Sequence, residues 1–128
     1  MISKKTAKAI NAQITREFFS AYLYLAMAND AQDKGFKGAA NWFTIQFQEE
    51  QGHALKFAHY LQEQGAKVEL GAIEKPKGEW KDLLEMFKES LAHEKKVTAW
   101  IGEIMTLAVE EKDYATQNML TWFINEQV

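Results

Sequence analysis

Apolar residues recur every three or four positions along most of the chain, and this spacing predicts helices. Three such segments cover Ser3–Lys34, Gly38–Gln64 and Lys81–Lys112. A fourth begins near Asp113, a residue type that favours helix N-caps, and is still helical in pattern at Val128. One proline and seven glycines in 128 residues also favour long helices over strands. The pattern therefore predicts an all-α protein.

The connections between the segments predict how the helices are arranged. Short turns at Gly35 and Asp113 make the first two helices antiparallel neighbours, and likewise the last two. Residues 66–80, which include Gly71 and Pro76, have no helical period. About fifteen extended residues span roughly 50 Å, which exceeds the roughly 40 Å of a helix of about 27 residues. We therefore expect a four-helix bundle with one long crossover between the second and third helices.

Each of the first three helices carries one carboxylate on its apolar stripe. The stripes are Ile10, Ile14, Glu17, Ala21, Tyr24 and Ala28; Phe43, Phe47, Glu50, Ala54, Phe57 and Leu61; and Leu84, Phe87, Leu91, Glu94, Thr98, Ile101, Met105 and Ala108. The three glutamates lie near the middle of their helices, so a bundle brings them to one level whichever way each helix runs. The stripe of the fourth segment is Thr116, Leu120, Phe123 and Gln127.

Glutamates on core-facing stripes suggest a metal site. Each ionised carboxylate buried without compensation would cost on the order of several kcal/mol, and a cation of charge two or more offsets that cost. His53 follows Glu50 by three residues, so both side chains point toward one site from one helical face. Carboxylates and imidazole without thiolates suit iron or manganese, and zinc could also bind. The ligand count suggests two metals bridged by Glu50.

Several candidate residues also have plain structural interpretations. One glutamate on an apolar stripe is usually a boundary residue, but three matching stripes and the Glu50/His53 pair favour a metal site. The default interpretation of Tyr24 is a core tyrosine, and the alternative is a role in redox chemistry. We expect His59 and His93 on solvated faces. Glu49 and Glu126 are surface carboxylates by default.

Composition narrows the function classes. A net charge of −3 without a basic stripe disfavours nucleic-acid binding. The absence of cysteine excludes disulfides, thiolate zinc sites and cysteine-bound iron centres. No apolar run approaches the roughly 18 residues of a membrane span, and no signal peptide is apparent, so we expect a cytoplasmic protein. The length predicts one domain over residues 1–128.

Several short motifs together resemble the non-haem ferritins of bacteria and archaea. They are Arg16-Glu17-Phe18, Tyr22-Leu23-Tyr24, Gln48-Glu49-Glu50 followed by His53, His93-Glu94, and Trp122 followed by Glu126-Gln127-Val128. Each motif is weak alone, but their joint spacing is specific and covers the whole chain. The resemblance implies a ferritin-like bundle in a hollow shell of 24 subunits. It also implies oxidation of Fe(II) by dioxygen or hydrogen peroxide at a dinuclear ferroxidase centre, and storage of the ferric product as mineral.

The resemblance also implies roles for individual residues. The implied ligands are Glu17, Glu50 and His53 for the first iron, Glu50, Glu94 and nearby Gln127 for the second, and Glu49 and Glu126 for a third, weaker site. Tyr24 would lie beside the centre as an electron donor. The implied partners are Fe(II), the oxidant and further copies of the chain.

Two departures from the family pattern have consequences. The family's fourth helix continues past Val128 with further ligands of the third site, and a short fifth helix follows it. We therefore expect a fourth helix truncated within its length, an incomplete third site, uncovered apolar surface and impaired shell assembly. Gly52 stands where haem-binding relatives have methionine, and a second Glu-x-x-His is missing from the fourth helix, so we expect no haem.

Three alternative functions remain. One is a di-iron oxidase or peroxidase similar to rubrerythrin, although the cysteine-ligated iron domain of those proteins is absent. A mini-ferritin that protects DNA is weaker, because those proteins build their site between subunits. The third is an inactive bundle or scaffold with protonated or exposed glutamates, which an unchanged metal-free stability of Glu50→Ala would support.

Overall fold

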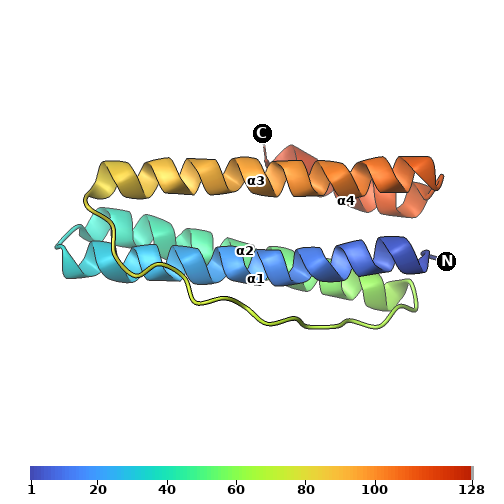
Figure 1. Ribbon diagram of the computed structural model, residues 1–128, viewed down its shortest axis with the longest axis horizontal. Helices are drawn as coiled ribbons and strands as arrows, with labels where there is room; N and C mark the ends of the chain where they lie inside the picture. Colours follow the sequence, from blue (N-terminus) through green and yellow to red (C-terminus); the bar gives the residue numbers. More distant parts are fainter. Residues whose placement is uncertain (128) are drawn as a thin grey trace.

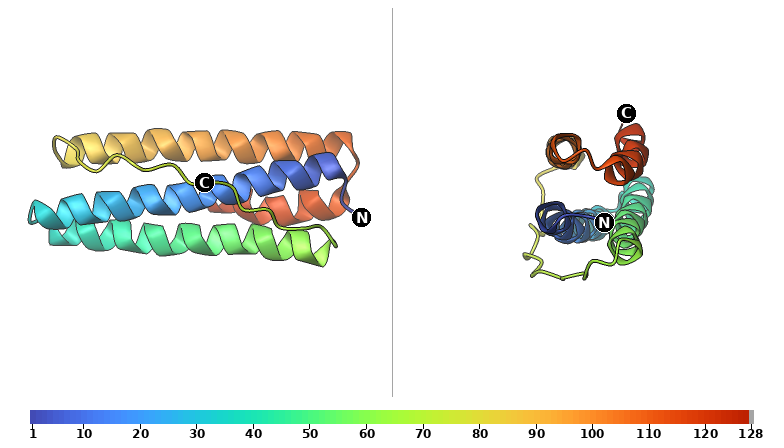
Figure 2. Two further views of the ribbon diagram at one scale, coloured as in Figure 1. Left: turned by 60° about the horizontal axis from the view of Figure 1, so that its bottom comes forward. Right: turned by 90° about the vertical axis from the view of Figure 1, so that its right-hand side faces the viewer.

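The computed structural model describes residues 1–127, which fold into four helices without strands (Figure 1). The helices are α1 (Lys4–Asp33), α2 (Lys37–Glu63), α3 (Leu83–Glu110) and α4 (Tyr114–Glu126). The end-on view in Figure 2 shows the α1–α2 hairpin packed against the α3–α4 hairpin, with α3 beside α1 and α4 beside α2. The predicted all-α four-helix architecture is confirmed. No helix among the described residues is long and apolar enough to cross a membrane.

The helix ends follow local sequence signals. Ser3, Asp82 and Asp113 cap α1, α3 and α4, and each side chain accepts a hydrogen bond from the backbone N–H three residues later. Gly35 and Gly65 have φ of 83° and 74°, the left-handed conformation that closes α1 and α2. The predicted boundaries therefore agree with the structure to within two residues.

The crossover runs in extended form along the outside of the first hairpin and joins α2 to the far end of α3 (Figure 1). Near its start, the Asn11 side chain donates to the Lys67 carbonyl at 3.0 Å. At its other end, the N–H of the buried Trp80 donates to the Asp30 carboxylate at 3.1 Å. Side chains of α1 thus hold both ends, and the predicted single long crossover is confirmed.

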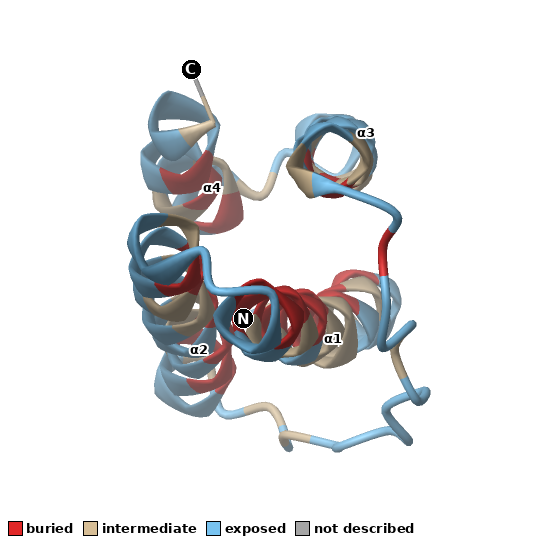
Figure 3. Cartoon of the chain, turned by 90° about the vertical axis from the view of Figure 1, so that its left-hand side faces the viewer, coloured by how far each residue is buried: buried red, intermediate tan, exposed pale blue. Residues whose placement is uncertain are grey.

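The buried residues lie on the parts of the helices that face one another (Figure 3). The predicted stripe of α1 is buried throughout, from Ile10 to Ala28. The stripe of α2 is buried except for Phe47, which is half-buried. The predicted apolar positions of α4 are buried as well. For these three helices, spacing alone identified the core face.

The buried face of α3 differs from the predicted one in its first half. Leu84, Phe87 and Leu91 are 63%, 40% and 59% exposed. The residues that are buried instead are Met86, Ser90, His93, Val97, Ile101, Ile104 and Ala108. Figure 1 shows that α4 reaches only the middle of α3. The first half of α3 therefore faces the α1–α2 hairpin alone and buries a face turned toward it.

The extent of the fourth helix bears on the predicted truncation. Within the described residues α4 has 13 residues and ends at Glu126. The predicted continuation to Val128 lies outside those residues, so truncation is not confirmed and stays a prediction. The rings of Trp42 on α2 and Phe87 on α3 pack against each other, and these residues are 44% and 40% exposed.

Candidate metal centre

The α1–α2 hairpin brings Glu17, Glu50 and His53 together. One ligand atom from each lies within 4.8 Å of the other two. Nδ1 of His53 is 3.3 Å from Oε2 of Glu50 and 4.0 Å from Oε2 of Glu17. The group forms because the antiparallel hairpin sets the middles of its helices side by side, and because residues three apart share a helical face.

The surroundings of this group oppose the charged form of its carboxylates. Glu17 is fully buried and Glu50 is 3% exposed. Burial, and then the nearby Glu50 carboxyl, raises the pKa of Glu17 to about 9. Burial also raises the pKa of Glu50 to about 7. Oε2 of Glu17 is buried without a hydrogen-bond partner. A divalent cation at this point would supply that missing partner and offset the repulsion, so the donor set fits a metal.

Glu94 approaches the group from the second hairpin. It is half-buried on α3 and accepts a hydrogen bond from the hydroxyl of Tyr24, which is buried on α1. Burial, followed by the charge of Glu94, raises the pKa of Tyr24. The charge of Glu94 also contributes to the raised pKa of Glu50. Glu94 therefore lies near the group, although it is not one of the three residues that converge.

Gln127 and Glu126 lie at the end of α4. Oε1 of the half-buried Gln127 accepts a hydrogen bond from the Thr98 hydroxyl at 2.9 Å. Gln127, the exposed Glu126 and Glu94 line a hollow of about 300 Å³ between α3 and α4. Glu49 is exposed on α2. Among the described residues, neither Glu49 nor Glu126 belongs to a cluster of three metal-ligating groups.

His93 does not lie on a solvated face, contrary to the sequence-based expectation. It is 7% exposed, and its Nε2 lies 2.6 Å from Oγ of Ser20. The Ser20 hydroxyl also lies 3.0 Å from the Arg16 carbonyl. Burial lowers the pKa of His93, as expected for a neutral core imidazole. Its spacing of four from the buried Val97 was the sequence signal for this position.

Gln13 contacts the candidate site but was not among the residues predicted from the sequence. Its side chain is fully buried, and its amide Nε2 donates to Oε1 of Glu17 at 3.0 Å. The signal was present in the spacing, because Gln13 lies three residues after Ile10 and four before Glu17. Glutamine is mostly an exposed residue type, which explains why the position drew no attention.

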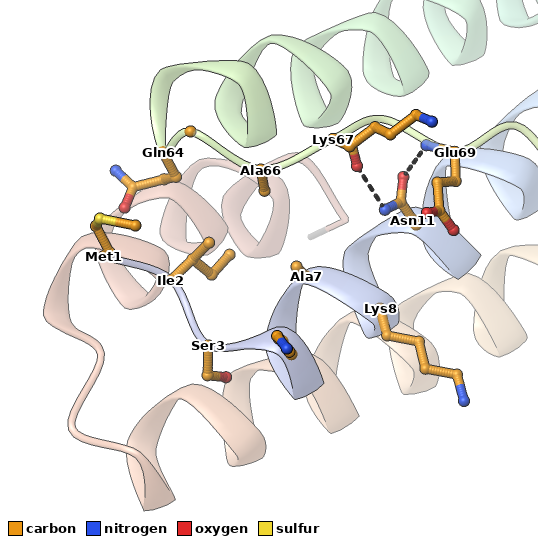
Figure 4. Close-up of a pocket in the computed structure, with 12 residues that line it drawn as sticks. Met1, Ile2, Ser3, Ala7, Lys8, Asn11, Gln64, Ala66, Lys67 and Glu69 are labelled. Carbon is orange, nitrogen blue, oxygen red and sulfur yellow. Dashed lines mark hydrogen bonds between the residues drawn. The ribbon is translucent and has the colours of Figure 1, made fainter.

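A larger hollow lies elsewhere in the described part of the chain. It measures about 670 Å³ between the N-terminus and the start of the crossover (Figure 4). Met1, Ala7 and Ala66 contribute to its lining, and Asn11 holds the crossover beside it through Lys67. None of the candidate ligands lines this hollow. Since a metal ion needs ligand atoms rather than a large cavity, the hollow does not compete with the buried group.

Comparisons with known proteins agree with this geometry. Residues 7–128 match the family model described as a ferritin-like domain. The chain is 39% identical to the bacterial non-heme ferritin of Staphylococcus aureus and 40% identical to that of Staphylococcus haemolyticus, in each case over all of this chain and 77% of the relative. Among solved structures, an open-pore ferritin from the archaeon Archaeoglobus fulgidus superimposes with a TM-score of 0.98 at 44% identity, covering 99% of this chain and 78% of that one. The Chlorobium tepidum ferritin gives 0.96 at 32% identity with the same shares. The chain therefore belongs to the ferritin family.

Proposed function

We propose that this chain is a haem-free iron-storage ferroxidase whose substrate is Fe(II). The observation that best supports the proposal is the convergence of Glu17, Glu50 and His53 around a buried carboxylate oxygen without a partner. Membership of the ferritin family supports iron as the metal, as do relatives named non-heme ferritins. The ligand types also suit iron, since neutral imidazole and carboxylates are typical iron ligands in proteins.

The two irons take different ligands in this proposal. The first is held by Glu17, Glu50 and His53. The second is held by the bridging Glu50 together with Glu94 and Gln127, which share the hollow between α3 and α4. Binding the second iron would replace the hydrogen bonds that these two side chains now make. We therefore expect the first position to bind more tightly.

Oxidation removes one electron from each of two Fe(II) ions. Dioxygen takes both electrons and two protons to give hydrogen peroxide, or hydrogen peroxide takes them with two protons to give two waters. Tyr24, through its hydrogen bond to Glu94, lies where it could supply a further electron. Its raised pKa means that its hydroxyl keeps the proton at neutral pH, so the proton would leave only with the electron.

Storage requires more than the single chain. We propose that residues 1–128 form one domain, that copies assemble into a shell in the cytoplasm, and that the ferric product is deposited inside. Glu49 and Glu126 would contribute to a third, weaker site. Both residues are exposed, which suits transient binding of iron better than tight binding.

The test is an aerobic Fe(II) titration followed by ultraviolet absorbance. We expect rapid oxidation that saturates at about two irons per chain, and a loss of at least about tenfold in rate for Glu50→Ala, because that change removes a ligand of both irons. Glu110→Ala, an exposed carboxylate at the end of α3, is the matched control and should leave the rate unchanged. Oxidation no faster than in buffer would refute the ferroxidase.

Particle size separates storage from the alternatives. A large particle that gains many irons per chain supports storage. Rapid oxidation of two irons without further uptake would instead favour the oxidase or peroxidase similar to rubrerythrin. Metal-free stability unchanged by Glu50→Ala, together with no oxidation, would favour the scaffold.

A further inference from the structure

Gln13 is a buried polar residue on α1 that lies between apolar core residues and Glu17. It is 0% exposed, as are its neighbours on the same face of α1, Ile10 and Ile14. Its Oε1 is buried and has no hydrogen-bond partner. Burying an unsatisfied polar atom costs roughly 1–3 kcal/mol, so packing alone does not account for a glutamine here.

The single hydrogen bond of Gln13 makes the two oxygens of Glu17 different. Nε2 of Gln13 donates to Oε1 of Glu17 at 3.0 Å. The other oxygen, Oε2, has no hydrogen-bond partner and lies 4.0 Å from Nδ1 of His53. Oε1 of Glu17 is therefore held by another residue of α1, and Oε2 faces the candidate ligands on α2.

We propose that Gln13 is a positioning residue for the metal site, which holds Oε1 of Glu17 so that Oε2 alone is offered to the first metal. The inference rests on the proposed function, because it assumes that Glu17 binds a metal. Hydrogen bonds to ligating carboxylates fix their orientation, and their loss typically lowers metal affinity about 10- to 100-fold.

An amide suits this role better than other side chains would. It donates a hydrogen bond to a carboxylate without adding a charge that would repel a cation. Its length spans one turn of α1, since Gln13 and Glu17 are four residues apart. The unsatisfied Oε1 of Gln13 then lowers the stability of the fold, and this loss accompanies the role of Gln13 in the site.

The test measures binding of Co(II), which is not oxidised under anaerobic conditions and whose visible absorption reports its ligands. Gln13→Met keeps the length of the side chain and removes the donor. We expect this variant to bind Co(II) 10- to 100-fold more weakly at the site that Glu50→Ala eliminates, with a changed absorption spectrum because Glu17 is free to rotate. Metal-free stability should change little, because the variant removes the unsatisfied Oε1 of Gln13 but leaves Oε1 of Glu17 without its donor.

Two further variants keep the test decisive if Gln13→Met folds poorly. Gln13→Asn is one methylene too short to reach Glu17 and should give the same loss of affinity. Ile14→Val is the matched core control, which lowers stability by about 1 kcal/mol and should leave Co(II) binding unchanged.

The outcomes separate the inference from the proposed function. If wild-type protein binds no Co(II) at Glu50, the proposed function fails and the role of Gln13 fails with it. If wild-type protein binds Co(II) and both Gln13 variants bind it within about threefold as tightly, only the inference is overturned. A loss of affinity that also appears in Ile14→Val, in proportion to the loss of metal-free stability, would mark Gln13 as a packing residue and also overturn it.

Discussion

The carboxyl groups of Glu17 and Glu50 keep their protons more strongly in the folded chain than in the unfolded chain. Burial raises their pKa values from an ordinary 4.5 to about 9 and about 7. Between those values and about pH 4.5, the native state binds protons that the unfolded state has released. The metal-free fold therefore loses stability as the pH rises through this window. A bound cation takes the place of the proton and removes the loss.

This linkage predicts a falling melting temperature for the chelator-treated protein between pH 7 and 9. Burial lowers the pKa of His93, so this residue makes the stability rise with pH, but only below about pH 6.5. Above pH 7 His93 therefore does not contribute to the slope. Glu17→Gln should flatten the slope, because a neutral amide has no proton to lose. Glu110→Gln, an exposed control, should keep the slope. A wild-type melting temperature that does not change over this range would contradict the assignment.

The burial of two polar residues, Gln13 and His93, was not predicted from the sequence. Gln13 could have been found, because it lies three residues after Ile10 of the predicted stripe and one turn before its partner Glu17. The buried position of His93 has a local signal, but its contact with Ser20, which is 73 positions earlier in the chain, has none. A contact between residues so far apart follows from how helices dock, and no local pattern contains it.

At the scale of elements, α1 and α2 could be predicted almost completely and α3 only in part. The caps and apolar spacing of the first two helices depend on local chemistry. The sequence of α3 fits two overlapping apolar stripes, one that includes Leu84 and Leu91 and one that includes Met86 and Val97. Which stripe is buried along its first half depends on the helices that pack against α3, and that is a non-local fact.

The helix-ending glycines give a prediction at this scale. Gly65 has φ of 74°, where a Cβ is unfavourable, so Gly65→Ala should lower the unfolding free energy by about 1 kcal/mol. Gly102 lies inside α3, and an added Cβ there would meet no atom within 4 Å. Gly102→Ala should therefore raise the unfolding free energy by about 0.5–1 kcal/mol. Denaturant unfolding of both variants checks the opposite signs, and equal signs would contradict this account of how α2 ends.

At the scale of the whole molecule, the two hairpins are joined by aromatic packing near the metal site. The rings of Phe57 on α2 and Phe123 on α4 stack with their centroids 3.9 Å apart. Phe123 also packs against the ring of His53 at 5.7 Å. This contact couples the docking of the second hairpin to the orientation of a candidate ligand.

Adjacent residues of α4 test that coupling. Phe123 is 1% exposed and Ile124 is 38% exposed. Phe123→Ala should destabilise the fold by about 3–5 kcal/mol and weaken Co(II) binding, because His53 loses a neighbour. Ile124→Ala should cost less than about 1 kcal/mol and leave binding unchanged. Thermal unfolding and Co(II) titration distinguish the two, and similar effects of both changes would show that the hairpins do not dock through Phe123.

The distribution of the candidate ligands between the two hairpins predicts a consequence for folding kinetics. Glu17, Glu50 and His53 all belong to α1 and α2, whereas Glu94 and Gln127 arrive only across the crossover. Glu17 and Glu50 are 33 positions apart, whereas Glu17 and Glu94 are 77 apart, so bringing the first three together costs less loop-closure entropy than adding Glu94. A cation can therefore bind as soon as the first hairpin forms. Iron would then act as a folding template, accelerating formation of that hairpin before the second one docks.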